Sequence, residues 1–145
     1  MIIKRNMLIC GRCNPPPVDM QANPAYSGVY WNSNDNMHEK AMSMRGTPLR
    51  VEHNTGAVGS VLSGWIGPDQ SMYVLAEIDV TKINGAVAAA CVKSGRLAEF
   101  SLGYKSTMTR EADGQVRAGE KTIQELSLVA TGARPNCNIT HKSAV

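Results

Sequence analysis

Alternating apolar and polar positions predict that most of this chain forms β-strands. The clearest pattern is a hairpin, in which a small and apolar run at 57–66 is followed by a turn at 67–70 and a strand at 72–80. Every other residue of that second strand is apolar, and residues two apart in a strand share one face. The apolar face consists of Met72, Val74, Ala76, Ile78 and Val80.

Further apolar runs have the length and composition of strands. They cover residues 1–10, 28–31, 49–53, 97–105 and 122–131, and the first is predicted to end at Gly11. Because proline disrupts regular structure, the run Pro15–Pro17 predicts an irregular loop over 14–24. The polar segment 106–121 is predicted as a second loop, with a turn at Asp113 and Gly114.

Two segments have helical features. Residues 81–94 carry apolar side chains three and four positions apart, and Gly95 stands where a helix C-cap belongs. A shorter helix is predicted from an N-cap at Asp35 to Met44, with Gly46 after it. With six or seven strands and few helices, the predicted fold class is α+β, mainly β: a small closed or partly closed β-barrel with peripheral helices.

Composition and charge narrow the possible classes of protein. A chain of 145 residues with 43% hydrophobic and 19% charged residues is expected to form one soluble globular domain over 1–145. The net charge is only +3, and no basic run is longer than Lys4–Arg5, so we expect neither nucleic acid nor a membrane surface as partner. No apolar stretch reaches the roughly 18 residues of a membrane span.

The cysteines are irregularly spaced, and the N-terminus does not resemble a signal peptide. Free thiols in a reduced intracellular compartment are therefore expected for Cys10, Cys13, Cys91 and Cys137. Cys10 and Cys13 could form half of a zinc site, but no second CxxC or HxxxH follows. We expect no metal and no other cofactor, and a zinc hydrolase that uses these two cysteines and a histidine stays as an alternative.

One of only three histidines stands at the end of a predicted strand. Strand alternation places Leu49, Val51 and His53 on one face, so the imidazole would lie on the apolar side, next to a turn at 54–56. A structural histidine at the edge of the core is one interpretation. The other is a general base, which requires a nucleophile and an acid elsewhere in the chain.

Two other predicted strands supply such groups. In "EFSLGY", Glu99, Ser101 and Gly103 share a face, and the glycine would leave room for a substrate backbone. In "IQELSLVAT", both faces are nearly apolar, so Glu125 is expected to be partly buried and to need a partner. An ordinary strand serine and a structural pair of Glu125 with Arg or Lys are the alternatives.

A serine hydroxyl becomes a useful nucleophile only with a base in hydrogen-bond reach and a third group that orients the base. Ser101, His53 and Glu125 supply one residue of each kind, on three different predicted strands. The sequence therefore predicts a Ser-His-Glu triad. Glu99 is an alternative acid, although it lies beside the nucleophile on the same strand.

Three segments resemble viral maturation proteases. "TPLRVEHN", followed by "AVGSVLSGW", resembles the active-site histidine segment of herpesvirus maturational proteases, the assemblins. "LAEFSLGY" resembles the nucleophile strand of assemblins and of tailed-phage prohead proteases. "QELSLVATGARP" resembles the Glu-x-Ser-Leu-Val strand of the phage enzymes and ends in a turn like that of assemblins, whose own third member is a histidine. The motifs occur in family order over about residues 1–137.

The resemblance implies a serine endopeptidase domain, over 1–145, that cleaves scaffold and capsid precursor proteins during procapsid maturation. It implies a seven-stranded barrel, a homodimer, and a location inside the immature capsid in the host cell. By the same resemblance Ser101 is the nucleophile, His53 the base and Glu125 its partner, while the Ala133 amide and Arg134 form the oxyanion hole. A non-catalytic β-barrel binding module, such as a nucleic-acid binder, is the alternative; the 5% aromatic content and the lack of a basic stripe argue against it.

Overall fold

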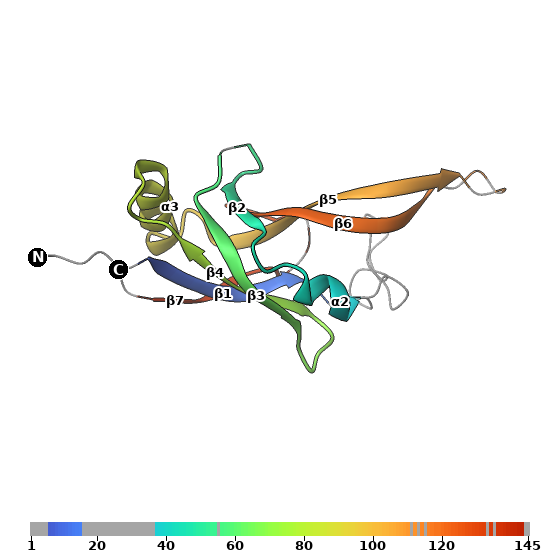
Figure 1. The fold of residues 1–145 in the computed structure, drawn as a ribbon, viewed down its shortest axis with the longest axis horizontal. Coiled ribbons are helices and arrows are strands. Elements are labelled where there is room, and N and C mark those ends of the chain that lie inside the picture. The colour runs from blue at the N-terminus through green and yellow to red at the C-terminus, as the bar shows by residue number, and fades with distance from the viewer. Residues whose placement is uncertain are drawn as a thin grey trace, which may run out of the picture.

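Seven strands hydrogen-bond into one curled sheet in the order β5-β6-β2-β3-β4-β1-β7 (Figure 1). The computed structural model describes residues 6–15, 37–54, 56–110, 112, 114, 116–132, 134 and 136–143. The strands are β1 (Met7–Asn14), β2 (Pro48–Val51), β3 (Gly59–Ile66), β4 (Met72–Ile78), β5 (Glu99–Arg110), β6 (Val116–Val129) and β7 (Ile139–Lys142). The helices are α2 (Met37–Met42) and α3 (Ile83–Lys93). Neighbouring strands are antiparallel, except that β2 and β6 run parallel.

The curl of the sheet brings its two ends together. Asn138, just before β7, forms an isolated bridge with Glu99 at the start of β5. The Phe100 amide donates to the Cys137 carbonyl over 2.7 Å, and the Ile139 amide donates to the Ala98 carbonyl over 2.9 Å. The result is a half-barrel, which confirms the predicted mainly β class and partly closed barrel. It also places the segment after β6 beside the strand that carries Ser101.

The hydrophobic core lies against the inner face of this sheet. In β4 the predicted alternation is confirmed, because Met72, Val74, Ala76 and Ile78 are fully buried. Phe100 of β5 and Leu126 and Leu128 of β6 are buried in the same cluster. Burial of each such large side chain contributes about 1.5–3 kcal/mol to the stability of the fold. The strands that carry the candidate site are therefore anchored in the core by their inward-facing side chains.

Helix α3 forms over the predicted segment, and Gly95 follows it with φ of 82° as expected of a C-cap glycine. The apolar spacing that predicted the helix does not mark its packed side, because Ile83, Ala86, Val87 and Ala90 are exposed. Small residues determine which side of α3 packs against the rest of the protein. A Cβ on Gly85 would lie 1.8 Å from the Asp79 carbonyl oxygen, so the helix approaches the backbone too closely for a larger residue. The packed side is Gly85, Ala88, Ala89 and Val92, and Ile83 and Val87 are exposed. No helix in the described part of the chain is long and apolar enough to span a membrane.

The first strand differs from the prediction. It does not end at Gly11 but continues through it to Asn14. A Cβ at Gly11 would lie 2.2 Å from the Asn138 carbonyl oxygen, so this glycine allows close backbone approach next to β7 rather than a turn. The predicted strand at 28–31, the N-cap at Asp35 and most of the loop 14–24 lie outside the described residues.

The segment 106–121 is also different from the prediction, since most of it is strand. β5 and β6 stay paired from Glu99 opposite Val129 to Arg110 opposite Val116, and they form a long ribbon that projects from the sheet (Figure 1). The sequence of this segment is polar, and the ladder hydrogen bonds are made by backbone groups, so hydropathy alone suggests a loop. The predicted position of the turn is consistent with Gly114, which has φ of 83°.

Candidate active site

His53 lies in a turn at the end of β2, and not in the strand as predicted. The β2 ladder ends when the Glu52 amide donates to the Leu128 carbonyl over 3.0 Å, and Glu52 Oε1 then accepts from the Ala130 amide over 2.9 Å. Glu52 and His53 both adopt positive φ, 51° and 62°. Such left-handed backbone is unfavourable for residues with a Cβ, and it persists where surrounding contacts enforce it, often at functional sites. The turn carries the imidazole away from the apolar side and over the β5–β6 pair.

Three predicted site residues meet at this turn. His53 Nε2 lies 3.0 Å from Ser101 Oγ, and His53 Nδ1 forms a short contact with Glu125 Oε1. These residues are 48 and 72 positions apart in the sequence, so only the fold brings them together. The imidazole is 42% exposed, whereas the Glu125 side chain is only 10% exposed. The carboxylate is therefore buried, whereas solvent can reach the imidazole.

The hydrogen-bond chemistry of the carboxylate determines the roles of the two ring nitrogens. An ionised carboxylate only accepts hydrogen bonds, so Nδ1 carries the proton that faces Glu125. Nε2 is then the unprotonated nitrogen, and it can accept the hydroxyl proton of Ser101. In this tautomer the imidazole is arranged to take a proton from Ser101.

The pairing of β5 with β6 puts the strand of Ser101 opposite the strand of Glu125. Ser101 pairs with Ser127, and Gly103 pairs with Glu125. A Cβ at Gly103 would lie 2.1 Å from Glu125 Oε1, so the missing side chain of this glycine makes room for the carboxylate. The approach of a substrate backbone to Gly103 stays a prediction. The register is irregular directly after it, between Gly103 and Tyr104.

Ser127 is a site residue that the sequence analysis did not single out. Its side chain is fully buried, and Ser127 Oγ donates to Glu125 Oε2 over 2.6 Å. Ser127 Oγ also accepts a hydrogen bond from the His53 amide over 3.1 Å. The available signal was the spacing in "ELS", because residues two apart in a strand point to the same side. Glu125 thus has a histidine and a serine as partners, and not the Arg or Lys of the structural alternative.

Glu99, the alternative acid, contacts a different part of the molecule. Its Oε1 accepts from the Gly132 amide over 3.0 Å. This hydrogen bond ties the turn after β6 to the start of β5, two residues before Ser101. The turn lies close to the backbone of β5, since a Cβ at Gly132 would lie 3.0 Å from the Phe100 carbonyl oxygen. Glu99 therefore anchors the turn that the resemblance identifies with the oxyanion hole.

Arg134 extends from this turn and is held from two sides. Its Nη1 donates to Asn14 Oδ1, and its guanidinium lies over the Tyr104 ring, 5.0 Å from the ring centre. The side chain of Asn14 is fully buried. These contacts show that Arg134 is an ordered, half-buried group rather than a freely solvated charge. Ala133, the other predicted oxyanion residue, lies outside the described residues.

The four cysteines are free thiols, and they do not form a common site. Burial raises the pKa of Cys137 to about 12 and that of Cys13 well above its usual value, while the positive charge of Arg134 acts in the opposite direction on both. Burial also raises the pKa of Cys10. Cys10 and Cys13 lie three apart in a strand, Cys13 buried and Cys10 half-buried, so the CxxC does not present two thiols on one side. Within the described part of the chain, no three His, Cys, Asp or Glu side chains gather as a metal site.

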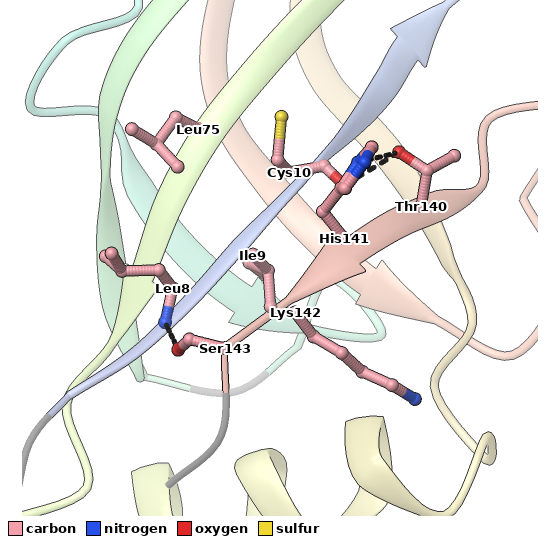
Figure 2. Close-up of a pocket in the computed structure, with 8 residues that line it drawn as sticks. All are labelled: Leu8, Ile9, Cys10, Leu75, Thr140, His141, Lys142 and Ser143. Carbon is pink, nitrogen blue, oxygen red and sulfur yellow. Dashed lines mark hydrogen bonds between the residues drawn. The ribbon is translucent and has the colours of Figure 1, made fainter.

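A separate hollow of about 490 Å³ lies on another part of the sheet (Figure 2). It is lined by residues of β1, β4 and β7 and by Ser143, and Figure 2 shows Leu75, Cys10 and His141 around it. His141 Nδ1 lies 3.0 Å from Thr140 Oγ1, and the Leu8 amide donates to Ser143 Oγ over 2.8 Å. None of the three residues that meet at the β2 turn lines this hollow.

Known proteins resemble this chain in structure but not in sequence. No protein-family model matches it, and no curated protein matches its sequence. The protease of Kaposi's sarcoma herpesvirus in complex with a hexapeptide phosphonate inhibitor aligns over 97% of this chain, with TM-score 0.63 and 15% identity. The same viral protease in complex with an allosteric inhibitor aligns over 96%, with TM-score 0.56 and 13% identity. The chain spans 66% of the first of these structures and 76% of the second, and it has the fold of herpesvirus proteases.

Proposed function

We propose that this protein is a serine endopeptidase with Ser101 as nucleophile, His53 as general base and Glu125 as the partner of His53. The observation that carries the proposal is the hydrogen-bonded series from Glu125 through His53 Nδ1 and Nε2 to Ser101 Oγ. Each hydrogen bond joins residues from distant parts of the chain, and each runs in the direction that proton transfer needs. The herpesvirus protease fold supports the same conclusion independently of these distances.

In the proposed reaction the proton of Ser101 moves to His53 Nε2 as Ser101 Oγ bonds to the carbonyl carbon of the scissile peptide. The π-electrons of that carbonyl move onto its oxygen, which becomes the oxyanion of a tetrahedral intermediate. Glu125 stabilises the imidazolium that forms, because its negative charge faces Nδ1. His53 then gives its proton to the leaving amine, the C–N bond breaks, and water hydrolyses the acyl-enzyme by the same route.

The turn at 132–134 is the proposed source of oxyanion stabilisation. Glu99 holds this turn against β5 beside Ser101, and Arg134 is fixed by Asn14 and Tyr104. Donors that are ordered before reaction stabilise developing charge without a cost of reorganisation at that moment. The Ala133 amide and the Arg134 side chain are assigned these roles by the assemblin resemblance.

The substrates follow from the same resemblance. We propose that scaffold protein and capsid precursors are cleaved inside an immature viral capsid, by a homodimer that needs no cofactor. The similar herpesvirus protease structure is a complex with a hexapeptide phosphonate inhibitor. The imidazole of His53 is 42% exposed, so a peptide that lies across Ser101 could reach it from solvent.

A fluorophosphonate probe tests the proposal. It reacts with a serine only where a base activates the hydroxyl, so we expect one covalent adduct per chain, located at Ser101 by peptide mass spectrometry. Ser101→Ala should remove the adduct. Ser60→Ala, which changes a half-buried serine in β3, should keep it. Lack of labelling in the folded wild type across several probes would refute the peptidase and favour a non-catalytic binding module.

A further inference from the structure

The Ser127 hydroxyl closes a ring of hydrogen bonds around the His53–Glu125 pair. It donates to Glu125 Oε2 over 2.6 Å and accepts from the His53 amide over 3.1 Å. His53 reaches the same carboxylate a second time, because its ring nitrogen Nδ1 contacts Oε1. The base is thus linked to its acid both directly and through Ser127.

Burial explains why the second connection matters. The imidazole is 42% exposed, so packing alone does not fix its orientation. His53 also has a left-handed backbone, which is unfavourable for a residue with a Cβ. Ser127 is fully buried near the C-terminal end of β6 and is the hydrogen-bond acceptor of the His53 amide. The rigid strand therefore holds the turn through this hydroxyl.

We propose that Ser127 is a positioning residue, whose hydroxyl fixes the Glu125 carboxylate and the His53 backbone in the arrangement from which Nε2 reaches Ser101. The inference rests on the proposed peptidase function. Without the hydroxyl, Glu125 Oε2 would lose its donor in a place that is only 7% exposed. The carboxylate would turn towards another donor, and Oε1 would then move away from Nδ1. Small displacements in such constellations cost up to about 100-fold in rate.

The test measures fluorophosphonate labelling of Ser101 in Ser127→Ala, resolved into the inactivation rate and the probe affinity. We expect the rate to fall about 10–100-fold, with probe affinity unchanged, because the proposed defect is in activation of Ser101. Ser127→Thr, which keeps the hydroxyl, should restore most of the rate. If the alanine variant does not fold, Ser127→Cys fills the same space with a weaker donor and carries the same test.

The matched control is Ser71→Ala. Ser71 is also fully buried, and its hydroxyl donates over 2.9 Å to a carboxylate two residues earlier, that of Asp69. Its loss should leave the labelling rate unchanged. In proton NMR, we expect a downfield Nδ1–H resonance of His53 in the wild type and in Ser71→Ala, and an upfield shift or loss of it in Ser127→Ala. This spectrum reports the ring of hydrogen bonds without any need for activity.

A double-mutant cycle separates positioning from an independent effect. Because Ser127 is proposed to hold the same His53–Glu125 pair, the loss in the double variant Ser127→Ala/Glu125→Gln should be clearly smaller than the product of the two single losses. Equal labelling rates for Ser127→Ala and wild type, or losses that multiply in the double variant, would overturn the inference and leave the peptidase intact. Absence of labelling in wild type would instead overturn the peptidase, and the inference with it.

Discussion

Glu125 and Asp69 each accept a hydrogen bond from a serine hydroxyl two residues later in the chain, but their surroundings are opposite. Glu125 lies in β6, its side chain is only 10% exposed, and its second partner is the ring of His53, 72 residues away. Asp69 lies in the turn between β3 and β4, and its side chain is 38% exposed. One carboxylate is buried at a meeting point of distant segments, and the other is at the surface.

The partners of Asp69 form a closed local cluster. Its carboxylate accepts from the Ser71 amide and hydroxyl, from the Tyr73 hydroxyl and from Arg12 Nη2. Arg12 also interacts with Tyr73 inside this cluster, which ties the hairpin turn to β1. At Glu125 the donor His53 has a second ring nitrogen that continues to Ser101. The two carboxylates thus differ in whether their hydrogen-bond donor also contacts a third residue such as Ser101.

The largest expected effect concerns the buried carboxylate. Glu125→Gln keeps the shape but removes the charge opposite the imidazolium, and its amide can favour the wrong tautomer of His53. We expect the labelling rate of Ser101, or peptide turnover, to fall on the order of 10²–10⁴-fold. Thermal unfolding of the variant should be checked in parallel, so that a loss of activity is not confused with a loss of fold.

Glu99→Gln is the control for that variant, since it neutralises a carboxylate that contacts Gly132 and not His53. Its effect should be clearly smaller, because an amide oxygen can still accept from the Gly132 amide. A crippled Glu99→Gln beside a normal Glu125→Gln would show that the acid has been assigned to the wrong residue.

Arg134 is expected to give the next largest effect. Arg134→Ala removes the side chain assigned to the oxyanion and should lower turnover by about 10–10³-fold. The contacts with Asn14 and Tyr104 also disappear, so Tyr104→Phe serves as a control that keeps the ring beneath the guanidinium. Wild-type kinetics in Arg134→Ala would show that this ordered arginine has a structural role, as Arg12 has beside Asp69.

The strands of the site could be predicted, but the connections between them only in part. Apolar alternation located the strands of Ser101 and Glu125 and the low exposure of Glu125, because these depend on local spacing. The turn at His53 could not be read from "RVEHN", since its left-handed backbone depends on contacts with Leu128 and Ser127 in a distant strand. Local pattern therefore indicated which residues to consider, and the sheet order decided how they meet.

Gly103 and Ser127 show the same limit. The sequence marks Gly103 as a place where something approaches closely, but whether that is a substrate or the Glu125 carboxylate depends on the β5–β6 register. In the polar segment beyond Gly103 the strands pair through backbone groups, so hydropathy alone did not predict them. The Asp69 cluster depends less on the order of the strands, because three of its four donors lie within four residues of the carboxylate in the sequence.

The smallest expected effect concerns the surface carboxylate. Partial desolvation acts to raise the pKa of Asp69, but the hydrogen bonds from Ser71, Tyr73 and Arg12 outweigh it and lower the pKa to about 2. A depressed pKa means that the folded state favours the ionised form. The stabilisation is therefore fully present above the ordinary value of 3.8, and it is lost as the pH falls from there through 2.

Asp69→Asn should accordingly lower the unfolding midpoint near pH 7 by only about 2–4 °C, because a pair this exposed is screened by solvent. The difference from wild type should shrink between pH 4 and pH 2, and also at high salt. Labelling of Ser101 should stay at the wild-type rate, because no donor to Asp69 contacts His53, Glu125 or Ser101 among the hydrogen bonds of the described residues. A loss of labelling in a folded Asp69→Asn would show that the two serine–carboxylate pairs are coupled, and the contrast between them would then fail.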